Sequence, residues 1–268
     1  MSNITVIKLG GSTLGHHDTS LDDITSLWRE GHRFVLVHGG GPTISEWLAI
    51  HNVESHFVRG LRVTDARTLE VVVAVLCGVV NKQLVAQLAA RGAGVIGLSG
   101  ADGGLIRARR YDEELEFVGD VVSIDAAAIT SMADGGAIVV LAPVAIEVAE
   151  IGEEGREGDT LSPQLLNLNA DTVAGQVAAS IQAERLIFLT DVPGVKDADG
   201  VVLESLSMEQ AQELGAAGVI EGGMIPKVEA ALLAASAGVR AVIVDGRETA
   251  ALRAVLAGSP VGTKIGWL

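Results

Sequence analysis

Two of the five lysines in this 268-residue sequence stand beside paired glycines, where a positive charge could meet a bound anion. Lys8 lies at the end of an apolar, β-branched run and is followed by Gly10 and Gly11. Lys227 follows the glycine pair 222–223. Glycine lets the backbone turn sharply and approach a ligand closely, and a lysine is costly to bury unless it lies at a strand end. Considered alone, Lys8 fits a surface lysine equally well.

Two further stretches have the chemistry to bind an anionic ligand. Three consecutive glycines in His38–Pro42 separate a predicted strand from a predicted helix, and free backbone N–H groups at such a helix start can face an anion. A tight turn needs fewer glycines than this. Arg62, in the loop 60–65, carries a guanidinium fork that suits a carboxylate. Without other information, Arg62 is better explained as a surface arginine.

Asp171 and the turn Asp191–Gly194 complete the set of candidate residues. Asp171 begins a predicted helix, where a carboxylate is ordinarily a cap. Asn167 and Asn169 flank it and add hydrogen-bond donors and acceptors for a polar ligand. The turn Asp191–Gly194 follows the predicted strand Leu186–Thr190, and ligands of open α/β sheets bind at the carboxyl ends of parallel strands.

Most of the remaining sequence alternates apolar strand-like runs with helical segments. This alternation predicts an α/β fold whose mostly parallel sheet is covered on both faces. The segment 105–124 predicts a hairpin beside that sheet. The helix predicted over 66–91 is too apolar to have one wet face along its whole length, so we expect one side in the core and another in a subunit contact. The other predicted helices span 21–30, 126–133 and 208–214, and further strands span 34–37, 138–141 and 241–245.

The composition narrows the classes of partner. A net charge of −15 argues against binding to nucleic acid or an anionic membrane, and 49% hydrophobic residues indicate a folded chain. No uninterrupted apolar run is long enough to span a bilayer and the N-terminus does not read as a signal peptide, so we expect a cytoplasmic protein. Cys77 is typical of a small core residue. The pair His16–His17 beside Asp18 is typical of a solvated loop, so no metal site is expected.

Taken together, these motifs resemble the amino acid kinase family over essentially the whole chain. The matching stretches are Lys8–Gly11, His38–Pro42, Gly60–Thr64, Asn81–Lys82, Asn167–Asp171, Leu189–Gly194 and Gly222–Lys227. Their number and order make the resemblance specific. It implies a three-layer αβα sandwich with a mostly parallel central sheet, shared by an N-terminal lobe (1–180) and a C-terminal lobe (181–268).

The resemblance is greatest to the members that phosphorylate the side-chain carboxylate of N-acetyl-L-glutamate with ATP in arginine biosynthesis. It implies that Lys8 and Lys227 grip the transferring phosphoryl group and that Asp171 holds both lysines. The residues it assigns to the acetylated substrate are Gly40, Gly41, Arg62 and Asn167. Those it assigns to ATP are Gly10, Gly11, Asp191, Val192, Pro193, Gly194, Val195, Lys196, Val219, Ile220 and Glu221. Mg²⁺ is expected to arrive with the nucleotide, without a cage of protein ligands.

The resemblance also bears on assembly and on alternative functions. Arginine-inhibited hexameric members carry an extra N-terminal helix, whereas seven residues precede Lys8 here, so we expect a homodimer that arginine does not inhibit. One alternative is a kinase for aminoadipate or glutamate carried on a small acidic protein. It would be expected to show a basic docking patch, and the sequence offers only the arginines at 107, 109 and 110. The other alternative is a catalytically silent ligand-binding member of the fold.

Overall fold

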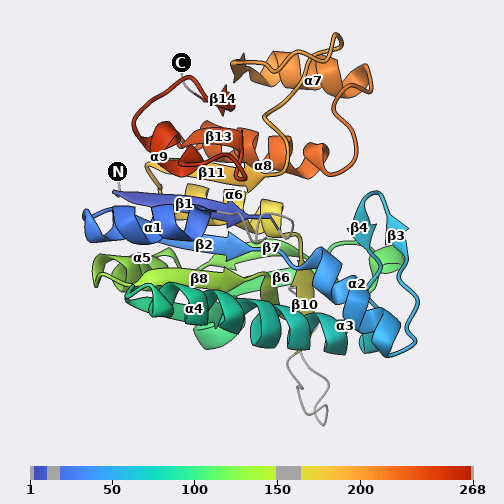
Figure 1. Cartoon of the computed structure of the whole chain (residues 1–268). Helices are drawn as coiled ribbons and strands as arrows, with labels where there is room; N and C mark the ends of the chain where they lie inside the picture. The colour runs from blue at the N-terminus through green and yellow to red at the C-terminus, as the bar shows by residue number, and fades with distance from the viewer. Residues whose placement is uncertain (1–2, 11–18, 149–163, 267–268) are drawn as a thin grey trace.

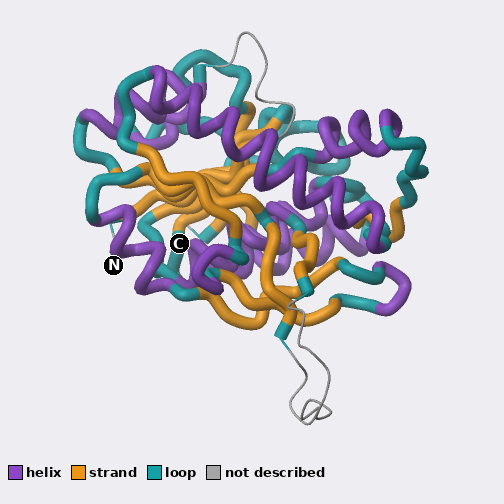
Figure 2. The backbone as a smooth tube through the Cα atoms, turned by 90° about the horizontal axis from the view of Figure 1, so that it is seen from below, coloured by secondary structure: helices purple, strands orange, loops and turns teal. Residues whose placement is uncertain are grey.

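A computed structural model describes residues 3–10, 19–148 and 164–266 of the chain. Figures 1 and 2 show a layer of strands with helices on both sides. The expected three-layer α/β sandwich is therefore confirmed. Gly11 and the His16–His17 pair beside Asp18 lie outside the described residues.

An eight-stranded sheet forms the middle layer, in the order β12-β14-β13-β11-β1-β2-β8-β5. Its strands are β1 (Ile4–Leu9), β2 (Arg33–His38), β5 (Val95–Ser99), β8 (Ile138–Ala142), β11 (Arg185–Thr190), β12 (Ser205–Leu206), β13 (Arg240–Asp245) and β14 (Thr263–Ile265). All neighbours pair in parallel except β13 and β14, which are antiparallel. Residues 1–180 and 181–268 thus contribute to one shared sheet.

Alternation along β1 decides which helix layer each side chain meets. Ile4 and Val6 belong to the core that includes α5, α6, α7 and α8, whereas Ile7 and Leu9 belong to the core on the opposite face with α1, α2 and α9. Successive strand residues point to opposite faces, so Lys8 shares the face of α6 and α8. The bounds are α1 Ser20–Arg29, α2 Gly41–Ile50, α5 Ala126–Asp134, α6 Ala170–Ser180, α7 Met208–Ala216, α8 Met224–Ser236 and α9 Ala251–Leu256.

The long apolar helix predicted over 66–91 is present but is not α-helical throughout. It consists of α3 (Ala66–Val73), a π-helical stretch η1 (Ala74–Val80) and α4 (Asn81–Ala90). Asp65 caps its start by accepting a hydrogen bond from the backbone N–H of Thr68. π-Helical turns inside α-helices are frequent near functional sites. This one lies against the glycine loop, where a Cβ on Gly40 would be 2.7 Å from Leu76 Cδ2.

Two smaller sheets flank the main one. The predicted hairpin 105–124 is confirmed as antiparallel β6 (Ile106–Arg110) and β7 (Val118–Ile124), which close a small sheet with β9 (Val144–Glu147) and β10 (Leu165–Leu168). A second hairpin, β3 (Phe57–Val58) and β4 (Leu61–Arg62), was not predicted. Its two turn residues, Arg59 and Gly60, have φ of 50° and 78°, as a tight two-residue turn requires.

Candidate active site

Lys8, Asp171 and Lys227 meet at the carboxyl end of β1. The Nζ of Lys8 is 2.9 Å from Asp171 Oδ1, and the Nζ of Lys227 is 3.3 Å from Asp171 Oδ2. The side chains of Lys8 and Asp171 are each 8% exposed, and that of Lys227 is 19% exposed. One carboxylate therefore faces two ammonium groups, and the cluster carries a net positive charge at the edge of the sheet.

Helix geometry brings Asp171 and Lys227 together. Asn169 caps α6, since its Oδ1 accepts from the backbone N–H groups of Asp171 and Thr172 at 2.8 and 3.1 Å. The carboxylate of Asp171 is thus left to pair with the lysines. Helices α6 and α8 touch at Gly175, where a Cβ would lie 2.7 Å from the carbonyl oxygen of Ala230. Only glycine permits this close approach.

Arg62, at the end of β4, is a buried cation. It is therefore not the surface arginine that its residue type alone would indicate. It donates to Ser55 Oγ, to Ser45 Oγ at 2.9 Å and to the carbonyl oxygen of Gly41 at 3.2 Å. Its guanidinium also stacks over the Phe57 ring, 4.7 Å from the ring centroid. All these partners are uncharged, and burial lowers the pKa of Arg62 from its usual value. Within the described part of the chain no carboxylate forms an ion pair with it, so an anionic ligand would supply the missing charge.

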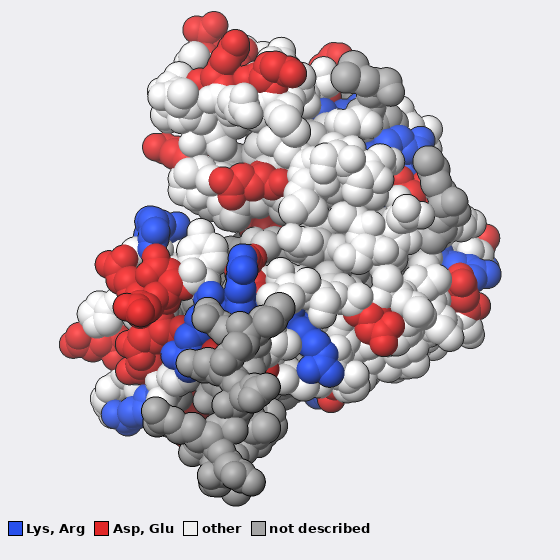
Figure 3. All heavy atoms as spheres, turned by 180° about the vertical axis from the view of Figure 1, so that it is seen from behind, with Lys and Arg blue, Asp and Glu red and all other residues white. Residues whose placement is uncertain are grey.

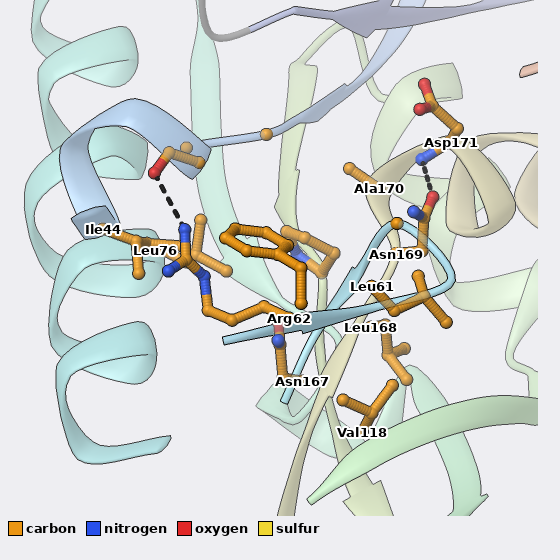
Figure 4. Close-up of a pocket in the computed structure, with 16 residues that line it drawn as sticks. Ile44, Leu61, Arg62, Leu76, Val118, Asn167, Leu168, Asn169, Ala170 and Asp171 are labelled. Carbon is orange, nitrogen blue, oxygen red and sulfur yellow. Dashed lines mark hydrogen bonds between the residues drawn. The ribbon is translucent and has the colours of Figure 1, made fainter. Parts of the chain in front are cut away.

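A cavity of about 260 Å³ extends between Arg62 and Asp171 (Figure 4). The four residues predicted to bind the substrate, Gly40, Gly41, Arg62 and Asn167, all line it. Asn169, Leu61, Leu76 and Phe57 line it as well. Pockets for drug-sized ligands usually measure roughly 300–1,000 Å³, so this cavity suits a smaller molecule. A negative group of that molecule would pair with Arg62, and the opposite end of the cavity reaches Asp171, which pairs with the two lysines.

The glycine loop at the side of this cavity is held by the buried polar residues His38 and Asn81. The Nδ2 of Asn81 lies 3.2 Å from His38 Nε2, and His38 Nδ1 lies 2.9 Å from the carbonyl oxygen of Gly39. Asn81 can only donate through Nδ2, so Nε2 accepts and Nδ1 carries the proton that bonds Gly39. Burial lowers the pKa of His38 to about 4, and the charge of Lys82 contributes to the lowering while the Gly39 bond opposes it. A neutral imidazole therefore fixes the first peptide of the loop.

The residues predicted to bind nucleotide lie in three places outside this cavity. Gly10 follows β1 and donates to the carbonyl oxygen of Leu189, and the segment Asp191–Lys196 follows β11. The segment Val219–Glu221 precedes α8. Two of these side chains, Val195 and Ile220, are part of the core beside α8. Only their backbone could therefore contact a ligand.

Several residues of the site have no counterpart among those predicted from the sequence. Ser45, Ser55 and Phe57 surround Arg62, and Leu76 forms a wall of the cavity. Ser45 follows the glycine loop by one helical turn, a spacing that could have indicated it. Ser55 and Phe57 carry no such signal, because their contacts depend on the fold of the β3–β4 hairpin.

Comparison with known proteins agrees with this architecture. A model of the amino acid kinase family matches residues 3–245, and the chain belongs to that family. An acetylglutamate kinase of Dehalococcoides mccartyi is 43% identical over 264 residues, which cover 98% of this chain and 94% of that protein. An acetylglutamate kinase of Dinoroseobacter shibae is 45% identical over 248 residues, covering 91% and 82%.

Solved structures extend the comparison to the fold. A protein of Streptococcus mutans UA159 is 29% identical with a TM-score of 0.80 and covers 99% of both chains. An N-acetylglutamate synthase from Neisseria gonorrhoeae, solved with coenzyme A and N-acetyl-glutamate, is 27% identical with a TM-score of 0.80, covering 98% of this chain and 59% of that one. A carbamate kinase of Giardia, at 16% identity and a TM-score of 0.68, shares the fold.

Proposed function

We propose that this chain transfers a phosphoryl group from ATP to the side-chain carboxylate of N-acetyl-L-glutamate and thereby serves arginine biosynthesis. The observation that carries the proposal is a small cavity lined by the buried cation Arg62 and by Asp171, the carboxylate that pairs with both Lys8 and Lys227. An acylated amino acid with two carboxylates matches both ends. Relatives that are 43–45% identical over more than 90% of the chain carry the name acetylglutamate kinase.

Phosphoryl transfer to a carboxylate requires the protein to align the two substrates and to neutralise their negative charges. It does not require a general base. A carboxylate is already ionised at neutral pH, so no proton has to be removed from the nucleophile. The obstacle is the repulsion between two anions, and two ammonium groups fixed beside the transferring phosphoryl group stabilise its spreading charge. Asp171 keeps Lys8 and Lys227 at a constant separation, so little reorganisation is needed during transfer.

We propose a separate task for each of the substrate-binding residues. We assign the α-carboxylate to Arg62, because it is the cation among the described residues that line the cavity and it lies across the cavity from Asp171 (Figure 4). Gly40 and Gly41 at the start of α2 offer backbone N–H groups to a ligand oxygen. Asn167, whose Nδ2 donates to Thr64 Oγ1 at 3.1 Å, holds a fixed orientation beside the substrate.

ATP is the phosphoryl donor that membership of this kinase family implies. We assign its binding to the loops after β1 and β11 and before α8, at the carboxyl edge of the sheet. The nearest carboxylate to the reaction, Asp171, is already engaged by two lysines, and no cluster of three metal-binding side chains occurs among the described residues. Mg²⁺ would therefore be bound through the nucleotide phosphates and would neutralise part of their charge.

The kinase for a carrier-bound substrate is the less favoured alternative. Arg109 and Arg110, two of the arginines considered for carrier docking, pair with Asp120 and Glu147 at 3.5 and 2.9 Å. On the face seen in Figure 3, the basic side chains border a group of acidic ones. The curated relatives also bear the name of the acetylglutamate enzyme.

At the level of the whole chain, we propose that residues 1–180 bind the acetylated substrate and form the dimer contact, whereas 181–268 bind ATP. The helix Ala66–Ala90 is long and apolar enough to cross a membrane by length and composition, and 39% of its most apolar window is buried. In a cytoplasmic enzyme its remaining apolar surface would be covered by a second subunit. The edge strand β5 lies beside this helix and leaves Ile96 38% exposed on the opposite face of the sheet, so a contact along this edge would cover both.

A coupled assay of ADP release tests the proposed activity. Purified protein is supplied with ATP, Mg²⁺ and one acceptor at a time: N-acetyl-L-glutamate, free L-glutamate or N-acetyl-L-aminoadipate. We expect rapid release with the first acceptor and little with the others, since free glutamate adds an ammonium group and the longer aminoadipate would place its reacting carboxylate one methylene away from the position that glutamate gives it. Equal rates with all three, or no release with N-acetyl-L-glutamate, would contradict the proposal.

A further inference from the structure

A second and larger cavity opens directly beside the substrate cavity. Its volume is about 660 Å³, against about 260 Å³ for the first. The two cavities share wall residues from the β3–β4 hairpin, from β7, from the end of β10 and from the residue that caps α6: Gly60, Leu61, Val118, Leu168 and Asn169. These shared walls make the second cavity the neighbouring space for a group that is too large for the first.

The walls of the second cavity suit an apolar group and not a phosphate. Its only cation among the described lining residues is Arg59, which pairs with Asp112 and with Glu114. Asp120, another lining residue, pairs with Arg109. Aliphatic side chains from β7, α6 and the start of α8 form much of the remaining wall: Val121, Val173, Ile225 and Pro226. Tyr111, Thr172 and Glu229 line it as well. A triphosphate would meet the carboxylates of Asp120 and Glu229 and no unpaired cationic side chain among these lining residues, whereas methylene groups would gain from burial against the aliphatic wall.

The substrate has one substituent that can reach this space. If its two carboxylates lie at Arg62 and at the lysine cluster, the acylamino group on the α-carbon is left to point sideways. The shared wall includes Gly60 and Leu61, which directly precede Arg62. At the same wall, Asn169 directs its Oδ1 to the backbone of α6, and none of the described residues accepts from its Nδ2, so this amide can donate to the acyl carbonyl.

We infer that the second cavity is an acyl-chain site, and that this enzyme phosphorylates N-acyl-L-glutamates whose straight acyl chain is longer than acetyl. The inference rests on the proposed function, because it assumes that the glutamate part binds as described. The reacting atoms are unchanged: a side-chain carboxylate oxygen bonds to the γ-phosphorus of ATP, the bond to the bridging oxygen breaks, and ADP leaves with that electron pair.

An acyl-chain series tests the inference. The kcat/KM of the full-length protein is measured with N-acetyl-, N-propionyl-, N-butyryl- and N-hexanoyl-L-glutamate. Because each buried methylene contributes favourable transfer free energy, we expect kcat/KM to rise by about threefold per added methylene up to butyryl. A butyryl to acetyl ratio above one supports the inference, and a ratio below one overturns it. Absence of activity with every acceptor, acetyl included, would instead show that the proposed function itself is wrong.

Tryptophan variants test whether the acyl chain of the substrate lies in the second cavity. Val121→Trp fills the second cavity without bordering the first, so the butyryl to acetyl ratio should fall at least fivefold. Val122→Trp is the matched control, since this neighbour is 52% exposed and lines neither cavity. Ile225→Trp enters from the opposite wall at an exposed position and serves if Val121→Trp does not fold. An unchanged ratio in a folded cavity variant would overturn the inference.

Discussion

At the scale of single residues, Lys8, Asp171 and Lys227 depend on one another. Each lysine is held by the same carboxylate, and the carboxylate is buried only because both lysines compensate its charge. Removing one member therefore changes the position and the charge of the others. Arg62 is different, because neutral partners hold it and its charge is available to a ligand.

Lys8→Met tests the proposed clamp on the phosphoryl group. The variant keeps much of the side-chain volume and loses the charge, so we expect kcat to fall by about 10²–10³-fold with a folded protein. Asp171→Asn should have a similar effect, because both ammonium groups lose their anionic partner. Steady-state ADP release gives kcat, and circular dichroism checks the fold. Lys264→Met, on β14 between β12 and β13, is the control. Normal turnover in the first two variants would exclude the mechanism.

Arg62→Ala tests the assignment of the α-carboxylate. Loss of a charge-assisted pair made equally in ground state and transition state should raise the KM for N-acetyl-L-glutamate by at least tenfold and leave kcat nearly unchanged. The KM for ATP should not move. A selective loss of kcat, or a raised KM for ATP, would place Arg62 on the other substrate.

His38 should make folding stability depend on pH. Its pKa is about 4 in the folded chain and near 6.5 in the unfolded chain, so the unfolded state binds a proton first as the pH falls. The stability contributed by neutral His38 is complete above pH 6.5 and is lost as the pH falls toward 4. Between pH 7 and pH 5 this loss should be about 2 kcal/mol. Urea denaturation at both values should show a smaller change for His38→Gln than for the exposed control His51→Gln.

At the scale of elements, the sequence predicted the helices and strands whose apolar residues recur at regular spacing. It missed the elements and caps that depend on contacts between distant segments. The helix expected over 21–30 and the strand expected over 34–37 are confirmed to within a residue or two, because their burial follows their own pattern. The β3–β4 hairpin has only four strand residues, so it shows no periodicity. The capping of α6 by Asn169 was also missed, since Asp171 is an equally good cap by residue type.

The residues of the candidate site also fall into those that the sequence could indicate and those that it could not. Paired glycines and motif order indicated Lys8, Asp171 and Lys227, which the fold brings together. The burial of Arg62 could not be predicted, because it comes from Ser45, Ser55 and Phe57 on separate segments. Which loops hold ATP stays a prediction.

Gly175→Ala tests the contact between α6 and α8. The added methyl would lie 2.7 Å from the carbonyl oxygen of Ala230, so the helices must separate. Overpacking of this kind costs about 1–3 kcal/mol, and the longer distance between Asp171 and Lys227 should lower kcat as well. Gly215→Ala is the matched control, since this glycine also lies within a helix but has open space where the methyl would be placed. Equal stability of the two variants in urea would refute the contact's importance.

At the scale of the whole molecule, the proposed dimer accounts for the apolar surface of the long helix and of β5. Sedimentation should give twice the 27.6 kDa chain mass. Ile96→Glu places a charge on the exposed edge and should yield monomers, whereas Val201→Glu, at a residue exposed elsewhere on the chain, should not. A monomeric wild-type protein would contradict the dimer.

The hairpin that carries Arg62 is attached to the molecule differently from the lysine cluster. Lys8, Asp171 and Lys227 belong to the central strand and two tightly packed helices, whereas the hairpin tip is tied to the β6–β7 loop through the exposed ion pairs of Arg59 with Asp112 and Glu114. Exposed ion pairs are weak and are screened by salt. The entry and exit of the acceptor should therefore become faster with rising ionic strength, while the rigid centre that performs the transfer keeps its geometry.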